Sequence, residues 1–344
     1  MKLLITGGGG FIGARLARTL LARGSLGGQP IEHLVLTDQV APPADLAGDR
    51  RVETRVGPLL SQVASLSRER LDGVFHLASA VSGECEADFD LGLRSNLDST
   101  RALLDGLRNA AATGKEPTRL VFSSSVAVFG PDPSVALPDR VGDDTLPAPK
   151  TSYGTHKLMC EHLIADYSRK GYIDGRSARL MTVTVRPGRP NGAASSFFSG
   201  IIREPLAGQE AICPVSPDVS HPLTSAAKTV EGLIAIYEAS VADLGGRLAL
   251  NLPAVNATVA QMLDALEAVA GPEVRARVRF VRDETIAAIV ANWPRGSTAA
   301  RAAKLGLKPD PDFASIIRQY IDDCATRPDG AAALEGLPRK GKPA

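Results

Sequence analysis

A glycine-rich turn near the start of the chain limits the folds open to it. Residues 3–6 form a short apolar segment, and residues 7–13 follow directly with the sequence GGGGFIG. Residues 11–23 then carry apolar side chains at helical spacing. Glycines in a strand-to-helix turn let the backbone approach an anion, and the amides at the helix start point towards it. This order of elements predicts a site for the pyrophosphate of a dinucleotide.

The first half of the chain alternates short apolar segments with amphipathic ones. The expected strands are residues 3–6, 34–37, 52–56, 74–78, 120–123 and 182–186, and the expected helices are 11–23, 93–112 and 152–170. Parallel strands need crossover connections, and helices of this length supply them. The pattern predicts an α/β fold with a Rossmann-like, doubly wound parallel sheet.

The second half is less regular and begins with a turn-rich segment, residues 187–192. Further helices are expected at residues 196–207, 221–239, 258–270 and 313–325, and strands at 248–252 and 277–281. We therefore expect a smaller C-terminal substrate lobe that is interleaved with the Rossmann domain. The expected division is residues 1–186 plus about 220–252 for the Rossmann domain, 187–219 and 253–326 for the lobe, and 327–344 for a flexible tail.

Composition argues against several kinds of partner. The net charge is only +1 among 344 residues, so nothing favours nucleic acid or an acidic membrane surface. No apolar run approaches the roughly 18–20 residues of a membrane span. The four cysteines show neither close pairing nor metal-ligand spacing, which predicts reduced thiols and no bound metal. The chain begins with a strand rather than a signal peptide, so we expect a cytoplasmic protein.

Asp38 is the residue expected to select the cofactor. It ends the second expected strand, 25 residues beyond Gly13. A carboxylate there can accept hydrogen bonds from both adenosine ribose hydroxyls, and it would repel a 2′-phosphate. Gln39 and Val40 follow, so no neighbouring arginine could pair with such a phosphate. These residues favour NAD over NADP; the alternative is that Asp38 merely ends a strand.

Three side chains are candidates for proton transfer. Tyr153 and Lys157 are four residues apart and would share one helix face. A phenol with a pKa of about 10 is a poor base at neutral pH, but a nearby ammonium lowers that pKa. Such a group can take a proton from an alcohol while hydride leaves the same carbon. Ser125 follows the fifth expected strand, at the sheet edge where ligands bind, and could orient the substrate oxygen.

With these motifs the chain resembles the extended short-chain dehydrogenase/reductase family. The matching pieces are Thr6-Gly7-x-x-Gly10-x-x-Gly13, Asp38, His76-Leu77-Ala78, Asn96, Ser125, Tyr153-x-x-x-Lys157 and residues 185–187. The resemblance spans roughly residues 1–320. It implies Ser-Tyr-Lys catalysis with NAD, a nicotinamide ribose bound by Lys157, and a proton relay aided by Asn96. It also implies a homodimer formed through the helices that carry Asn96 and Tyr153.

The resemblance also implies which residues contact the cofactor. They are Gly7, Gly10, Phe11, Ile12, Gly13, Asp38, Leu59, Leu77, Ala78, Ser79, Asn96, Tyr153, Lys157 and Pro187. Two positions depart from the family pattern. Pro58 replaces a common aspartate, so a backbone contact at Leu59 is expected in place of a side-chain contact to adenine. Phe129 replaces a common tyrosine, which removes a hydroxyl near the substrate.

Within that family, the resemblance implies oxidation of the C2 hydroxyl of a small, four-carbon sugar acid to its 2-oxo form. A carboxylate needs a cation or several donors, and Arg186, Arg189 and Arg203 are the candidates. Arg189 is preferred because it lies where the chain should leave the cofactor and enter the lobe. The expected substrate-binding residues are Ser79, Ser82, Ser125, Tyr153, Arg189 and Asn191.

Two other functions remain open from the sequence. One keeps the fold and exchanges the substrate for a nucleotide sugar, which would give an epimerase or dehydratase. The other is a non-catalytic, NAD-binding regulator, which the intact set of Ser125, Tyr153 and Lys157 disfavours. The stereochemistry of the substrate and the physiological direction of the reaction do not follow from the sequence.

Overall fold

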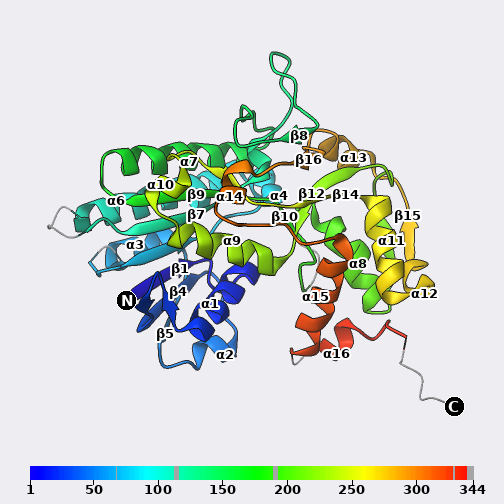
Figure 1. Cartoon of the computed structure of the whole chain (residues 1–344), viewed down its shortest axis with the longest axis horizontal. Helices are drawn as coiled ribbons and strands as arrows, with labels where there is room; N and C mark the ends of the chain where they lie inside the picture. Colours follow the sequence, from blue (N-terminus) through cyan, green and yellow to red (C-terminus); the bar gives the residue numbers. More distant parts are fainter. Residues whose placement is uncertain (67, 112–115, 189–192, 328–329, 339–344) are drawn as a thin grey trace.

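A seven-stranded parallel sheet forms the centre of the structure, a computed structural model that describes residues 1–66, 68–111, 116–188, 193–327 and 330–338 (Figure 1). The strand order is β13-β9-β7-β6-β1-β4-β5. The strands are β1 (Lys2–Thr6), β4 (His33–Asp38), β5 (Val52–Val56), β6 (Gly73–His76), β7 (Arg119–Ser125), β9 (Asp174–Leu180) and β13 (Leu250–Asn251). The order reverses between β1 and β6, and ligands of such sheets bind at the strand ends beside that point. The expected Rossmann-like α/β fold is confirmed.

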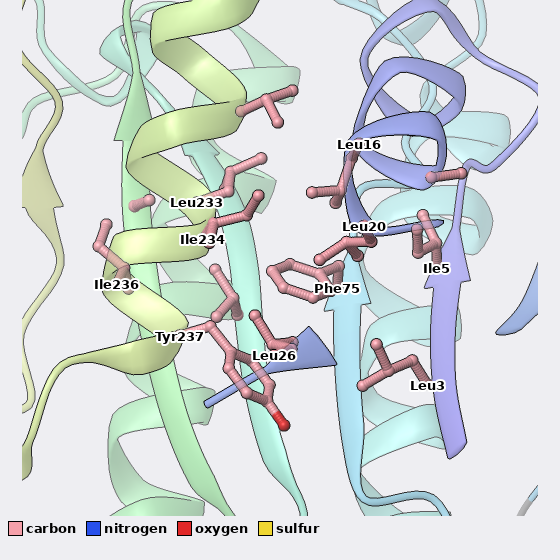
Figure 2. Packing of buried hydrophobic residues seen from close by; sticks show 14 of the residues in the cluster. Leu3, Ile5, Leu16, Leu20, Leu26, Phe75, Leu233, Ile234, Ile236 and Tyr237 are labelled. Atoms are coloured by element: carbon pink, nitrogen blue, oxygen red, sulfur yellow. The ribbon is translucent and has the colours of Figure 1, made fainter. Parts of the chain in front are cut away.

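Helices cover both faces of this sheet. One face carries α3 (Leu59–Leu66), α6 (Ser99–Ala111) and α7 (Ser152–Arg169), and the other carries α1 (Phe11–Arg23) and α9 (Ala226–Glu238) (Figure 1). Side chains alternate between the faces, so Leu3 and Ile5 join the α1/α9 core whereas Leu4 joins the opposite one. Figure 2 shows Phe75 of β6 between Leu20 of α1 and the side chains of α9. Full burial of such a side chain contributes roughly 1.5–3 kcal/mol.

A second, smaller core lies in the C-terminal lobe. A three-stranded sheet there comprises β10 (Thr182–Val183), β12 (Ser220–Thr224) and β14 (Val255–Thr258). The helices around it include α8 (Ser196–Leu206), α11 (Val259–Ala270), α12 (Pro272–Arg275), α13 (Glu284–Val290), α15 (Phe313–Ala325) and α16 (Gly330–Ala333). Phe198, Met262 and Ile317 are fully buried among them. The lobe therefore has an apolar core of its own beside the cofactor domain (Figure 1).

Short elements complete the chain. They are β2 (Ser25–Leu26), β3 (Gln29–Pro30), α2 (Ala44–Ala47), α4 (Ser82–Ala87), α5 (Phe89–Gly92), a π-helix (Leu93–Asp98), a 3-10 turn (Val126–Val128), β8 (Arg140–Val141), β11 (Ala211–Cys213), α10 (Val241–Leu244), β15 (Val278–Phe280), β16 (Gly296–Ser297) and α14 (Ala300–Lys304). The π-helix leads directly into α6. The single helix expected over 93–112 is therefore wider over its first six residues, Leu93–Asp98, than over the rest.

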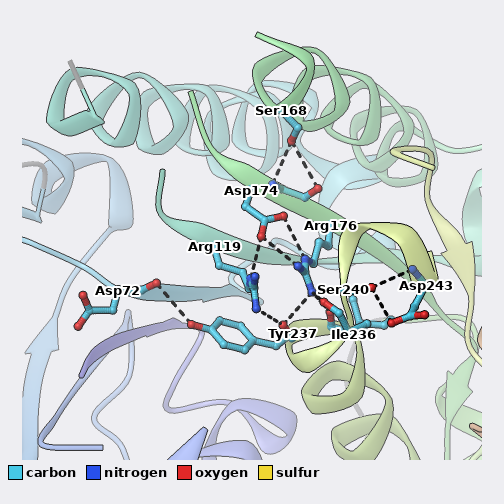
Figure 3. Close-up of polar contacts among 11 residues, drawn as sticks. Asp72, Arg119, Ser168, Asp174, Arg176, Ile236, Tyr237, Ser240 and Asp243 are labelled. Atoms are coloured by element: carbon cyan, nitrogen blue, oxygen red, sulfur yellow. Dashed lines mark hydrogen bonds and ion pairs between the residues drawn. The ribbon is translucent and has the colours of Figure 1, made fainter. Parts of the chain in front are cut away.

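The sixth strand lies earlier in the chain than expected. It is β9, whereas Thr182–Val183, at the start of the expected strand 182–186, pairs with β12 in the lobe. The sequence of β9 is too polar to predict a buried strand. Its buried Arg176 finds some of its hydrogen-bond acceptors only in the tertiary structure. That guanidinium pairs with Asp174 and donates to the carbonyl oxygens of Tyr237 and Ala239 at 2.8 and 2.7 Å (Figure 3).

Two further expectations need correction. The helix expected at 221–239 begins only at Ala226, because residues 220–224 form β12, which is antiparallel to β14. Part of the expected tail is packed rather than free. Gly336 donates its amide to the carbonyl oxygen of Leu206, and Leu337 packs against the core of the lobe. Both differences arise from partners far away in the sequence.

Candidate active site

The glycine turn has a shape that only glycine permits. Gly7 has a φ of +74°, in the left-handed region. A Cβ on Gly13 would lie 2.1 Å from the carbonyl oxygen of Gly7, and a Cβ on Gly7 would lie 2.8 Å from the amide nitrogen of Ala78. The first turn of α1 is therefore pressed against the ends of β1 and β6. This close approach leaves the helix start open to a phosphate, as the sequence predicts.

Asp38 ends β4 beside this turn, where the sequence places it. One carboxylate oxygen accepts the amides of Gly9 and Gly10 at 3.0 and 3.1 Å, and the other accepts the amide of Gln39 at 2.6 Å. That second oxygen also accepts the amide of Val40 at 3.3 Å, so the carboxylate braces the turn through four backbone amides. The turn and the carboxylate together fit the pyrophosphate and ribose of NAD.

A cavity of about 940 Å³ opens between the carboxyl ends of the strands and the lobe. Its wall brings together eight of the expected site residues: Phe11, Ile12, Leu77, Ser79, Ser82, Ser125, Tyr153 and Lys157. The lobe contributes other lining residues, among them Thr182, Arg186, Phe197, His221, Ile286 and Trp293. Such a cavity is large enough for the reactive end of a dinucleotide together with a small substrate.

Tyr153 and Ser125 meet because α7 begins tightly against the end of β7. Thr151 caps the helix by accepting the amide of Gly154 at 3.1 Å. A Cβ at Gly154 would lie 2.1 Å from the carbonyl oxygen of Ala127, so glycine is required for this approach. The Ser125 hydroxyl lies against the Tyr153 phenol and favours its ionised form.

The electrostatics differ from the expectation that Lys157 lowers the pKa of Tyr153. Burial is the largest influence, and it raises the pKa of Tyr153 above its ordinary value. The opposing influences come from Ser125 and from the positive charge of Arg186. Lys157 itself is buried, with its pKa lowered to about 8, and its Nζ donates to the carbonyl oxygen of Ser123 at 2.7 Å. Its Nζ lies 5.5 Å from the centre of the Tyr153 ring.

Asn96 lies behind the cavity wall, where the π-helix places its side chain. Its Oδ1 accepts the Ala80 amide at 2.7 Å and the Ser79 hydroxyl at 3.0 Å. Its Nδ2 donates to the Ala80 carbonyl oxygen at 3.2 Å and to Cys85 Sγ at 3.3 Å. The amide thus holds the loop that follows β6. A relay role for Asn96 stays a prediction, and the structure gives the residue this supporting task.

The remaining expected residues lie in several places. Ala78 follows β6 and donates its amide to Thr6 Oγ1 at 3.2 Å. Leu59 begins α3 and packs against the α3/α6/α7 core, away from the cavity wall. Pro187 is half-buried directly after Arg186. Arg189 and Asn191 lie outside the described residues.

The comparisons with known proteins agree with this geometry. A model described as the NAD dependent epimerase/dehydratase family matches residues 3–248. The chain belongs to this family. Since the family is described as NAD dependent, the expectation of NAD as cofactor is confirmed at the level of the family.

Individual members of the family are similar over nearly the whole chain. A D-erythronate dehydrogenase from Cupriavidus necator is 48% identical over 331 residues, which cover 94% of this chain and 98% of that protein. Another from Haemophilus influenzae is 42% identical over 324 residues, covering 94% and 99%. The solved structure of a nucleoside-diphosphate-sugar epimerase from Agrobacterium tumefaciens has a TM-score of 0.89 and 42% identity, and 94% of each chain is covered.

The lobe holds the cavity residues that sequence reasoning placed low or missed. The sequence favours Arg189 over Arg186 as the carboxylate-binding residue, and no motif indicates Ile286. His221 is held between Thr182 and the carbonyl oxygen of Pro294, and burial lowers its pKa to about 4, so the ring is neutral. No local pattern identifies such residues, because β12 and the segment after α13 reach the cavity only through folding of the lobe.

Two absences concern the described part of the chain alone. None of its histidine, cysteine, aspartate and glutamate side chains gather in a group of three that could hold a metal ion. None of its helices is both long and apolar enough to cross a membrane.

Proposed function

We propose that this chain is an NAD-dependent oxidoreductase that oxidises the C2 hydroxyl of D-erythronate to give 2-oxo-D-erythronate. The observation that carries the proposal is the meeting of Ser125, Tyr153 and Lys157 in one cavity that also contains the cationic side chain of Arg186. The 48% and 42% identical relatives that are D-erythronate dehydrogenases support the choice of substrate.

The proposed roles follow from the positions of the side chains. Tyr153 accepts the hydroxyl proton of the substrate, and Ser125 holds the reacting oxygen against the phenol. Lys157 contributes a buried positive charge at the end of β7, where Ser123 fixes it. Apolar groups such as Leu77 and Phe197 line the cavity and limit the access of water.

The residues that would hold the cofactor are those of the glycine turn, Asp38 and the cavity wall at Phe11, Ile12 and Leu77. Bound NAD supplies the acceptor for the hydride that leaves C2 of the substrate. The chain's own part is to fix the carbinol beside Tyr153 and to take up its proton.

A nucleotide-sugar epimerase is the second candidate. The similarity to the Agrobacterium tumefaciens protein described as a nucleoside-diphosphate-sugar epimerase favours it. An epimerase needs room for a whole nucleotide sugar and no net consumption of NAD. The positive charge in the cavity suits either substrate, because a nucleotide sugar carries a diphosphate and a hydroxy acid a carboxylate. The two D-erythronate dehydrogenase relatives favour the sugar acid.

One assay separates these candidates. The purified protein is incubated with NAD or NADP and with aldonic acids of four to six carbons, and the absorbance of reduced nicotinamide is followed. We expect stoichiometric NADH with D-erythronate and NAD, and much slower reaction with NADP because of Asp38. Epimerisation of a UDP-sugar without added NAD, together with no NADH from any aldonic acid, would replace the dehydrogenase by the epimerase. Tight NAD binding without either reaction would support the regulator.

The organisation of the protein is part of the same proposal. We assign cofactor binding to the expected residues 1–186 with about 220–252, except for the part from β10 to Arg186 and for β12, which belong to the lobe. Substrate binding is assigned to the lobe, formed by 187–219 and 253–326 together with these segments. We further propose a cytoplasmic homodimer that pairs through α6 and α7.

A further inference from the structure

Arg186 is the one arginine of the cavity wall among the described residues. The guanidinium is buried enough for its pKa to be lowered, and no carboxylate in the described part of the chain pairs with it. The charges that act on it are those of Tyr153 and Arg203. A desolvated charge without a counter-ion is costly, so proteins seldom keep one without a use.

The buried arginines of the described residues pair with carboxylates, whereas the partly buried Arg301 is bound, like Arg186, by carbonyl oxygens. Arg176 pairs with Asp174, Arg179 with Glu161, and Arg203 with Glu204. Among the described residues, the guanidinium of Arg186 is bound by neutral groups alone: its Nε donates to the carbonyl oxygen of Val183 at 3.0 Å and its Nη2 to Ser195 Oγ at 3.1 Å. A guanidinium has five N–H donors, so the fork keeps donors for an anion.

The backbone of Arg186 is also held firmly. Its amide donates to Ser199 Oγ at 3.0 Å, and its carbonyl oxygen accepts Nη1 of Arg203 at 2.8 Å. Both partners belong to α8, so two hydrogen bonds hold the backbone of Arg186 against this helix. A fork fixed in this way loses little conformational entropy when it binds a planar anion.

The other charges of the cavity agree with an anionic ligand. Its wall contains Lys150, Lys157 and Arg186 but a single carboxylate among the described residues, Glu86. Glu86 accepts the backbone amide of Ser152 at 2.8 Å, at the start of α7. Among the described residues, the wall that contains Tyr153 and Arg186 therefore carries more positive than negative side chains.

We propose that Arg186, rather than Arg189, binds the carboxylate of the substrate and so selects 2-hydroxy acids over neutral polyols. This inference deepens the proposed function and rests on it. In a 2-hydroxy acid the carboxylate carbon is bonded directly to the reacting carbinol carbon. An anion held by Arg186 therefore brings the carbinol into the cavity whose wall also contains Tyr153.

The test compares an acid with its uncharged isostere. D-Erythronate and D-erythronamide are oxidised by the wild type, Arg186→Met and Arg186→Lys, with Arg169→Met as the control for loss of an exposed arginine at the far end of α7. We expect the wild type to prefer the acid, and Arg186→Met to raise KM for the acid about 100-fold while KM for the amide stays within about threefold. Arg186→Lys should keep part of the preference, because an ammonium supplies charge without the fork.

A binding measurement makes the result independent of turnover. Erythronate is titrated into each protein saturated with NADH, and quenching of the nicotinamide fluorescence gives Kd. We expect Arg186→Met to weaken the acid about 100-fold and to leave Kd for NADH unchanged. Equal binding of acid and amide by the wild type overturns the inference even if the variant fails to fold.

The outcomes separate this inference from the proposed function. Loss of acid preference in Arg189→Met, with Arg186→Met unchanged, overturns the assignment to Arg186 while the dehydrogenase stands. Absence of erythronate turnover by the wild type overturns the proposed substrate. The carboxylate site is then tested by NADH-dependent binding of glycolate and lactate. If the wild type and Arg186→Met bind these acids equally, the assignment of the carboxylate to Arg186 is overturned as well.

Discussion

At the residue scale, the proposed chemistry depends on a phenol that the fold makes harder to ionise. Burial raises the pKa of Tyr153, and only Ser125 and the charge of Arg186 oppose that shift. Lys157 was expected to be the main activating group, but its Nζ is bound to the Ser123 carbonyl oxygen. The spacing of four residues thus indicated two side chains that line one cavity, without showing which groups set the pKa of the tyrosine.

Tyr153→Phe removes the hydroxyl that is the proposed proton acceptor and keeps the aromatic ring. We expect turnover of D-erythronate to fall about a hundredfold or more, because proton transfer loses its positioned base. NAD binding, followed by calorimetry, should stay close to that of the wild type. Turnover equal to the wild type would exclude Tyr153 from proton transfer.

The pH dependence of kcat/KM follows from the same group. The pKa of Tyr153 is raised, so the phenolate is a minor form near neutrality, and its fraction grows about tenfold for each pH unit below that pKa. We expect kcat/KM to rise between pH 6 and 8, a range over which Lys157, with a pKa of about 8, goes from almost fully charged to about half charged. The measurement is initial rates at low substrate, and a flat profile over this range contradicts the role.

At the element scale, a buried ion pair fixes α7 to the sheet beneath the site. Arg179 of β9 donates to Glu161 of α7 at 2.9 and 2.8 Å, and the Ser124 hydroxyl of β7 donates to the same carboxylate. Glu161 lies one turn beyond Lys157, so this contact sets how the catalytic face of α7 meets β7. Both side chains are almost fully buried.

Glu161→Gln leaves the Arg179 charge buried without its partner. We expect the free energy of unfolding to fall by about 3–5 kcal/mol, measured by urea denaturation. The double variant Glu161→Met, Arg179→Met should lose less than the single variant, because neither charge remains. A loss below about 1 kcal/mol in Glu161→Gln would show that the pair contributes little.

The elements themselves were predicted with uneven success, for physical reasons. Apolar strands such as β1 and amphipathic helices such as α1 have local patterns that reflect their burial. β9 contains two arginines and an aspartate, and its burial depends on Asp174, Arg119 and the carbonyl oxygens at the end of α9. The spacing of apolar residues along the sequence cannot show that these polar groups have hydrogen-bond partners, because the partners are up to 63 residues away.

At the scale of the whole molecule, the proposed cofactor site and the proposed substrate site belong to the two different cores. The sheet and the glycine turn form the cofactor side, and the lobe forms the other wall of the cavity with residues from α8, β12 and the segment after α13. The reacting groups of the sheet edge and Arg186 at the entry to the lobe therefore meet only in the complete chain.

Pairing through α6 and α7 is the prediction at this scale. Met159 on α7 has 44% of its surface exposed, which suits an apolar contact with a second copy. We expect light scattering after size-exclusion chromatography to give twice the chain mass of 36.0 kDa, and Met159→Glu to give the single mass. Val241→Glu, an exposed apolar position on α10, is the matched control. A monomeric wild type contradicts the proposed dimer.

The sequence by itself determined the cofactor half: the glycine turn, Asp38, and the set of Ser125, Tyr153 and Lys157. These features depend on local requirements, namely a backbone without Cβ atoms, a strand end and a helix face. Only the tertiary structure decided that Arg186 lines the cavity of the phenol, which groups shift the pKa of that phenol, and which lobe residues close the cavity. Those properties depend on desolvation and on contacts between distant segments, and no local pattern of residues contains either.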